Sequence, residues 1–240
     1  MDWSIDLKDY LLTERATGIV GIDPIEFEDG EALTTRALKF AIKAHEQQIR
    51  KNGTPYINHP IAVANLVREA GYGVDNIAAA YLHGVCENTN YTWEDIAKYF
   101  GQQIAYLVKY TTEEDKTKSW EERKENIIEK IQWQSTGHNI VLLCDKICNI
   151  EETIADVNAC GIEFFEKFTR GPEKQRWYYA RLYLAFEEIY KADYPLVQRF
   201  KSDVDEFRKT LERVNDGSVP LKRTITVPNS SKNLIIEDCK

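Results

Sequence analysis

Glycine and proline are scarce in this chain, with 12 and 7 residues among 240. Both residues mark turns and breaks, so their scarcity favours helices over many short strands. Hydrophobic residues make up 43% of the sequence and aromatic residues 11%, which is enough for a proper core. A chain of this length forms one large domain or a domain with a tail. The composition therefore predicts an all-α fold.

Cysteine pairs and long apolar runs are also lacking. The five cysteines include no C-x-x-C pair, which indicates reduced thiols rather than a disulfide framework or a zinc ribbon. Cys144 and Cys148 lie four residues apart in an apolar segment, and we interpret them as buried small side chains rather than metal ligands. No run of about 18 apolar residues is present, so no transmembrane helix is predicted. The acidic start lacks the features of a signal peptide, and we expect a cytoplasmic protein.

Basic residues are outnumbered, with 31 lysines and arginines against 39 acidic residues and a formal net charge of −8. Nucleic acids present a polyanionic backbone, so we expect no binding to DNA or RNA. A local basic patch can still hold a small anion. We therefore expect neither a nucleic acid nor a membrane as a partner.

Apolar residues recur at helical spacing along most of the chain. Thr92 and Ser119 each stand three residues before an acidic residue, which is the pattern of a capping box at a helix start. The charged run 113–118 between two helices is expected to be solvated surface. The predicted helices cover about 32–48, 58–71, 75–89, 93–100, 102–110, 120–133, 140–157, 172–186 and 195–214.

Four parts are expected along the chain. Residues 1–30 are acidic and form an N-terminal extension, and residues 31–191 form the main helical domain. Residues 192–214 form a C-terminal helix. Residues 215–240 form a loosely ordered tail, because glycine, proline and serine return there.

Polar side chains interrupt three of the apolar helices. His83, Glu87 and Asn88 follow an alanine-rich segment, and Asp145 and Asn149 follow the apolar run 140–143. An imidazole or a carboxylate costs free energy to bury without a partner. The three interruptions therefore indicate either a binding site or a network of hydrogen bonds.

The third interruption is His59, next to Pro60. His59, His83 and Asp145 together offer enough donors for a divalent metal such as manganese, iron or zinc. The alternative for a single histidine is a structural role, and His59 could simply cap its helix. Three separate interruptions favour a site over three unrelated structural residues.

The ordered motifs resemble the HD-domain family, and within it the RelA/SpoT hydrolase branch with its small metazoan SpoT homologues. The resemblance covers about residues 32–190. The motifs that carry it are Arg50-Lys51-x-Gly53-Thr54-Pro55-Tyr56-Ile57-x-His59-Pro60, Ala79-Ala80-Tyr81-Leu82-His83 with Glu87 and Thr89, Phe100-Gly101, and Asp145-Lys146-x-x-Asn149.

This resemblance implies an all-helical domain that holds one manganese ion and removes the 3′-pyrophosphate from guanosine tetra- or pentaphosphate. NADPH is a further type of substrate in the branch. By motif position, the metal ligands would be His59, His83 and Asp145, and Glu87 and Asn88 would stand where the family places the acidic pair that positions water. The resemblance further implies that Arg50 and Lys51 face the nucleotide, Asn149 its sugar, and Lys174 and Tyr178 the phosphates or base.

Structural or surface roles are the alternative for several of these residues. For Arg50 and Lys51 the alternative is that they are solvated loop charges. Tyr178 belongs to an aromatic cluster that is more often core than a stacking platform for a base.

Two positions depart from the family's pattern. Gly84 replaces the aspartate that follows the motif histidine, which removes a metal ligand, and Asn88 replaces an aspartate of the acidic pair. Asparagine keeps the shape of aspartate but neither carries its charge nor takes up a proton. Glu151 also stands where relatives often have a basic residue, which would disfavour an anionic ligand. We therefore expect an HD-domain phosphohydrolase whose activity is reduced or lost.

Two other interpretations stay open from the sequence. The first is a non-catalytic module that binds a nucleotide or another protein. The second is a different phosphohydrolase chemistry in the altered pocket.

Overall fold

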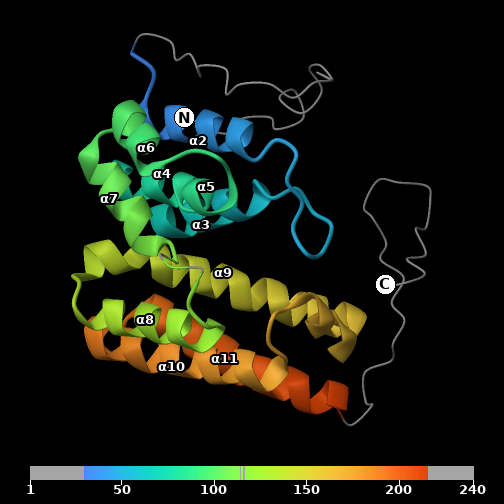
Figure 1. Cartoon of the computed structure of the whole chain (residues 1–240). Helices are drawn as coiled ribbons and strands as arrows, with labels where there is room; N and C mark the ends of the chain where they lie inside the picture. Colours follow the sequence, from blue (N-terminus) through green and yellow to red (C-terminus); the bar gives the residue numbers. More distant parts are fainter. Residues whose placement is uncertain (1–29, 114, 116, 216–240) are drawn as a thin grey trace.

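The computed structural model describes residues 30–113, 115 and 117–215, and within these residues the chain is helical apart from turns and one isolated β-bridge between Ile49 and Pro55. The predicted all-α fold is confirmed (Figure 1). The elements in chain order are α2 (Leu33–Ala44), α3 (Asn58–Glu69), α4 (Val74–Leu82), α5 (Val85–Asn88), α6 (Trp93–Phe100), α7 (Gln102–Thr111), α8 (Trp120–Gln132), α9 (Thr136–Cys160), the 3-10 helix η1 (Ile162–Lys167), α10 (Pro172–Tyr190) and α11 (Pro195–Asn215).

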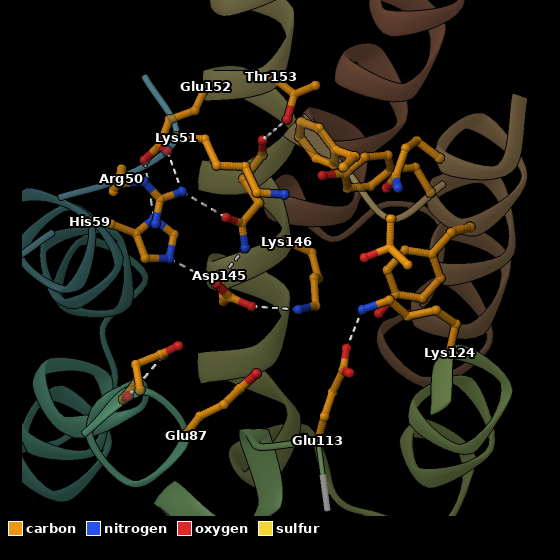
Figure 2. A pocket seen from close by; sticks show the side chains of 18 of the residues that line it. Arg50, Lys51, His59, Glu87, Glu113, Lys124, Asp145, Lys146, Glu152 and Thr153 are labelled. Carbon is orange, nitrogen blue, oxygen red and sulfur yellow. Dashed lines mark hydrogen bonds and ion pairs between the residues drawn. The ribbon is translucent and has the colours of Figure 1, made fainter. Parts of the chain in front are cut away.

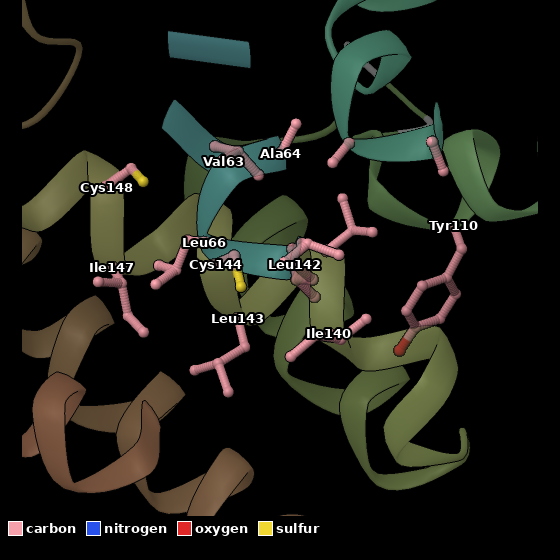
Figure 3. Packing of buried hydrophobic residues seen from close by; sticks show 14 of the residues in the cluster. Val63, Ala64, Leu66, Tyr110, Ile140, Leu142, Leu143, Cys144, Ile147 and Cys148 are labelled. Atoms are coloured by element: carbon pink, nitrogen blue, oxygen red, sulfur yellow. The ribbon is translucent and has the colours of Figure 1, made fainter. Parts of the chain in front are cut away.

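Helix α9 lies at the centre of the molecule. Helices α3, α4 and α7 pack on one side of it, and α10 and α11 pack on the other (Figure 1). Residues 139–145 are buried without interruption, as expected for a helix that is covered on every side. Figure 3 shows Val63 and Leu66 of α3 next to Leu142 and Cys144 of α9. Polar residues on α9 therefore lie inside the protein, where each needs a partner.

Local sequence signals set the helix starts. The capping boxes predicted at Thr92 and Ser119 are confirmed, because each side chain accepts from the third backbone N–H of its helix and the acidic residue bonds back. The single helix predicted over 75–89 is wrong. The chain turns at His83 and Gly84, so α4 ends at Leu82 and α5 begins at Val85. Glycine is a poor helix former, and it lies at this break.

The last helix belongs to the same packing. Helix α11 runs along α9 and α10 and buries Val197, Phe200, Phe207 and Leu211. The four-part division of the chain stays a prediction. Of the extension 1–30 and the tail 215–240, residues 1–29 and 216–240 lie outside the described residues. Among the described helices, none combines the length and apolarity needed to cross a membrane.

Candidate metal centre and its cavity

The three side chains predicted as metal ligands lie together. His59 comes from α3, His83 from the turn after α4, and Asp145 from α9. Asp145 Oδ1 lies 2.9 Å from His59 Nε2 and 3.6 Å from His83 Nε2. One ligand atom of each residue falls within 4.8 Å of the others, and all three side chains are buried. Two imidazoles and a carboxylate are a donor set used for zinc, manganese and iron.

Hydrogen bonds from the other ring nitrogen orient both imidazoles. His83 Nδ1 donates to the Ala80 carbonyl over 2.6 Å, and His59 Nδ1 donates to Glu152 Oε1 over 3.1 Å. Glu152 is held in turn by an ion pair with Arg50 (Figure 2). A neutral imidazole bonded in this way keeps its Nε2 lone pair for a metal. The residues present therefore fit a divalent cation.

Asp145 is held by two further neighbours. Lys146 Nζ lies 2.6 Å from its Oδ2, and Asn149 Nδ2 donates to its Oδ1 over 2.6 Å. Burial alone would raise the pKa of Asp145, but the Lys146 ammonium and the hydrogen bonds from both histidines hold that pKa well below its usual value. Burial would lower the pKa of His59, whereas its bonds to Asp145 and Glu152 raise it. A metal bound at His59 Nε2 would displace the proton that this nitrogen shares with Asp145.

These residues line a cavity of about 480 Å³, a typical size for a small-molecule site. Figure 2 shows Arg50, His59 and Asp145 on one side and Lys124 of α8 on the other. Five basic side chains (Arg50, Lys51, Arg123, Lys124, Lys146) and five acidic ones (Glu87, Glu113, Asp145, Glu152, Asp156) contribute to the lining. The formal charges of these ten side chains cancel, so only a bound cation would give the cavity a net positive charge.

The structure places most of the predicted ligand-binding residues in this cavity, including Glu87, Asn88 and Tyr178. Arg50 has two partners in the protein: it donates to Asn149 Oδ1 over 3.1 Å and forms an ion pair with Glu152. Lys51 Nζ lies 3.5 Å from the centre of the Phe168 ring. Arg50 is therefore not simply a solvated loop charge, whereas Lys51 is an exposed residue that contacts the Phe168 ring.

Lys174 is placed differently. It is absent from the cavity lining, and its half-exposed side chain lies with its Nζ atom 3.4 Å from Glu121 Oε1. Glu151 also points elsewhere, because Arg199 of α11 donates to its Oε1 over 2.7 Å. The expected clash between Glu151 and an anionic ligand is therefore not supported by its position. Glu151 instead links α9 to α11.

The interpretation of residues 113–118 as solvated surface is wrong for Glu113. Its side chain is largely buried, accepts from Arg123 Nε over 2.8 Å and pairs with Lys124 (Figure 2). Burial alone would raise the pKa of Glu113, but the charge and hydrogen bond of Lys124 lower it. Burial lowers the pKa of Lys124. A short charged run gave no signal that one of its members turns inward.

Glu152 was also missed by sequence reasoning, although a signal existed. It lies seven residues after Asp145 and three after Asn149, so all three share one face of α9. Extending the helical face by one turn would have found it. Lys146 lies next to Asp145 in the sequence, and its role as the carboxylate's partner depends on the tertiary fold.

Asn88 and Gly84 lie at the same end of the cavity. The Asn88 Nδ2 atom donates to the Tyr56 hydroxyl and to the Gly84 carbonyl, in both cases over 3.0 Å. Glu87, between them, points into the cavity (Figure 2), and burial raises the pKa of its carboxyl. Where the family has an acidic pair, this chain therefore has one carboxylate, Glu87, and one hydrogen-bonded amide, Asn88.

The protein is a helical domain with two histidines and an aspartate clustered in a polar cavity, a donor set that fits a divalent metal. Comparison with known proteins shows to which family of such domains it belongs. Residues 37–153 match the family model described as the HD domain. The human guanosine-3′,5′-bis(diphosphate) 3′-pyrophosphohydrolase MESH1 is 41% identical over 131 residues, which cover 53% of this chain and 70% of that protein. The chain belongs to the HD-domain family, in the branch of these 3′-pyrophosphohydrolases.

A bacterial relative extends the match. The guanosine-3′,5′-bis(diphosphate) 3′-pyrophosphohydrolase of Aquifex aeolicus (strain VF5) is 32% identical over 193 residues, which cover 74% of this chain and 26% of that protein. The solved structure of lmo0812 from Listeria monocytogenes EGD-e is 29% identical with a TM-score of 0.56, covering 69% of this chain and 99% of that one. A solved metazoan orthologue of SpoT that hydrolyses ppGpp has a TM-score of 0.62 at 23% identity, covering 77% of this chain and 99% of that one, and it supports the fold alone.

Proposed function

We propose that the cavity binds a purine nucleotide carrying a pyrophosphate group at a divalent metal, with manganese the first candidate, and that hydrolysis is slower than in relatives or lost. The observation that carries this proposal is the set of three buried ligand atoms within 4.8 Å in a cavity with five basic side chains. The ligands would be His59, His83 and Asp145. A metal there would neutralise phosphate oxygens and lower the pKa of bound water.

Other residues of the chain orient the proposed ligands and bring cationic groups to the cavity. Glu152 and Arg50 hold His59 in position, and Lys146 and Asn149 hold Asp145. Lys124 and Arg123 bring cationic groups to the opposite side, where both pair with Glu113, and a phosphate would compete with that carboxylate for them.

Glu87 is the group suited to accept a proton from water, because burial moves its pKa upward and closer to neutral pH. Asn88 has no such capacity, and its amide donates to Tyr56 and Gly84 instead. Loss of one positioned carboxylate is worth about 10²–10⁴ in rate. This difference supports reduced turnover.

Guanosine tetraphosphate is the first ligand to test, because the relatives' names give it as their substrate, and NADPH is the second. We propose no nucleic-acid partner, since the net charge is −8. A cytoplasmic location stays a prediction from the sequence.

The test is pyrophosphate or phosphate release from each nucleotide with and without manganese, together with calorimetric binding. Metal-dependent binding with slow or no release is expected. His59→Ala provides the control, since it should lose the metal-dependent part of binding. A protein that binds neither manganese nor nucleotide would contradict the proposal.

One alternative has a specific observation in its favour. Gly84 and Asn88 leave the α4–α5 side of the site without the two carboxylates of the family's pattern, which suits a module that retains a nucleotide without cleaving it. Tight binding with no release of pyrophosphate or phosphate under any metal tested would favour this module over the enzyme.

A further inference from the structure

A row of polar side chains runs along one face of α9. Asp145, Asn149, Glu152 and Asp156 follow one another at intervals of four, three and four residues, and all of them line the cavity. Figure 2 shows Asp145 and, further along the same helix, Glu152. A helix rises about 1.5 Å per residue, so Asp156 lies about 16 Å along the axis from Asp145. The row therefore joins the metal centre to a carboxylate at the other end of the cavity.

Asp156 is partnered differently from the carboxylate one turn before it. Glu152 forms an ion pair with Arg50, whereas among the described residues no cation forms an ion pair with Asp156. Its hydrogen-bond partner is the neutral side chain of Asn52. Asn52 Oδ1 accepts from the Thr54 backbone, so its amide N–H groups are left to face Asp156. Burial raises the pKa of this half-buried carboxyl, and its remaining lone pairs are available to a ligand.

Aromatic side chains line the same end of the cavity. Phe164 lies in η1 and Phe168 directly follows it, with their ring centroids 5.4 Å apart. Lys51, next to Asn52 in the loop, lies over the Phe168 ring. Lys167 of η1 donates to the Lys51 carbonyl over 3.2 Å, so the loop and η1 meet here. A carboxylate beside aromatic rings suits a planar base, because the rings contact the face of the base while a phosphate would be repelled.

Guanine and adenine differ at the edge that a carboxylate recognises. Guanine presents two neighbouring donors, N1–H and N2–H, whereas adenine presents the N6–H donor beside the N1 acceptor. An ionised carboxylate has acceptors only, so it bonds to both guanine donors in parallel and repels the adenine acceptor. Hypoxanthine keeps the N1–H donor and lacks the amino group, so it is intermediate between the two.

We propose that Asp156 selects the base of the bound nucleotide by accepting hydrogen bonds from N1–H and N2–H of guanine. This inference rests on the proposed function, because it requires phosphates held at the metal centre. The carboxylate repels phosphates at its own end of the cavity, which orients the ligand with its phosphates towards Asp145. Of the two candidate ligands, guanosine tetraphosphate is therefore favoured over NADPH, whose purine base is adenine.

The first experiment changes only the base. Calorimetric titrations of the full chain in the presence of manganese compare the 3′,5′-bisphosphates of guanosine, inosine and adenosine. The guanosine ligand should bind about 10- to 100-fold more tightly than the adenosine ligand, the range for one bidentate contact to a base, with inosine between them. Equal affinities for the three ligands would overturn the inference.

The second experiment changes only the carboxylate. Asp156→Asn keeps the size of the side chain and replaces one acceptor by a donor, so the ratio of guanosine to adenosine affinity should fall to within about threefold. Manganese affinity should stay within about twofold, because the metal centre is distant. Asp205→Asn, the same change at an exposed position of α11 outside the cavity, is the matched control and should keep the ratio.

Two results with Asp156→Asn would overturn the inference. A retained ratio would show that another group reads the base. An equal loss for all three ligands would show that the substitution acts through charge or fold rather than through contact with the base.

The two proposals fail in different ways. If the unchanged protein binds none of the three bisphosphates in the presence of manganese, the proposed function fails and this inference fails with it. If it binds all three without preference, only the inference about Asp156 fails.

Discussion

The two sides of the cavity differ in how their polar groups are partnered. On the α9 side, Asp145 and Glu152 are both carboxylates, and each bonds to His59. On the α4–α5 side, His83 is followed by Gly84 and by the neutral Asn88, whose amide bonds to its surroundings. The first side holds charges in pairs, and the second is largely neutral.

This difference separates two tasks that a metal-dependent hydrolase combines. Holding a metal requires ligands oriented by a second set of hydrogen bonds, and the α9 side has both. Activating water requires a carboxylate placed to take a proton. The α9 side has oriented groups for the first task, although Gly84 leaves out one ligand of the family's pattern, and the second task would depend on Glu87 alone. Four substitutions test this comparison.

The largest effect is expected from Asp145→Asn, on the α9 side. The change removes a proposed ligand and leaves the largely buried Lys146 ammonium without its anionic partner. Metal binding should be lost, and the free energy of unfolding should fall by about 3–5 kcal/mol, as for a broken buried ion pair. Urea denaturation and manganese titration measure the two effects. Glu163→Gln, an exposed carboxylate on η1, should change neither. Unchanged metal affinity in Asp145→Asn would remove Asp145 from the centre.

Asn88→Asp tests the neutral side. Restoring a carboxylate beside Glu87 should raise the rate of pyrophosphate release by about 10²-fold, the lower end for a positioned general base, because Gly84 is still present. The new carboxylate must also face the Gly84 carbonyl, now 3.0 Å from the amide nitrogen. The same change at exposed Asn90, two residues further on, is the control. A rate that does not rise would mean that neutrality at position 88 is not what limits turnover.

Glu152→Gln tests whether the carboxylate that bonds to His59 Nδ1 is needed for metal binding. The substitution keeps the shape but weakens the bond to His59 Nδ1 and the ion pair with Arg50. Metal affinity should fall about 10- to 100-fold, which is usual when a partner of a ligating histidine is lost. The neighbouring Glu151→Gln is a matched control, because Glu151 pairs with Arg199 outside the cavity. Equal losses in both variants would point to a general effect on α9.

The smallest effect concerns pH and the opposite side of the cavity. The folded protein lowers the pKa of Glu113 from 4.5, so the ionised carboxylate contributes stability above that pH and loses it as pH falls through the folded pKa. Glu113→Gln should cost about 1–3 kcal/mol at neutral pH, where it leaves Lys124 unpaired. The difference between the two proteins should shrink in urea titrations below pH 4.5. A difference that is constant with pH would exclude the ion pair as its cause.

Helix positions followed from local rules, with one informative exception. Both capping boxes form because a threonine or serine and an acidic residue satisfy the first backbone N–H groups of their own helices. The break at His83 and Gly84 was missed because apolar periodicity continues across it. His83 there donates to Ala80, and the turn aims its Nε2 atom at Asp145. Periodicity reports which face is buried and is insensitive to such a turn.

Residues of the candidate site were foreseen where a polar group interrupted an apolar helix. His59, His83 and Asp145 were found in this way, and the structure brings them together. Glu113 and Lys174 were misplaced in opposite directions: one turns into the cavity and the other pairs at the surface. Their neighbours in sequence are charged in both cases, so composition could not distinguish them.

The sequence by itself determined the all-α fold, the HD-domain motifs, the candidate ligands and the two positions that depart from the family's pattern. The fold class and the candidate ligands follow from residue type and local spacing, whereas the motifs and the two departures follow from the resemblance to the HD-domain family. Only the tertiary structure decided which polar groups are partners: Glu152 behind His59 and Lys146 on Asp145. Such pairings join segments that are distant in the chain, or depend on which side chain faces inward. Packing around α9, rather than local sequence, brings them within contact.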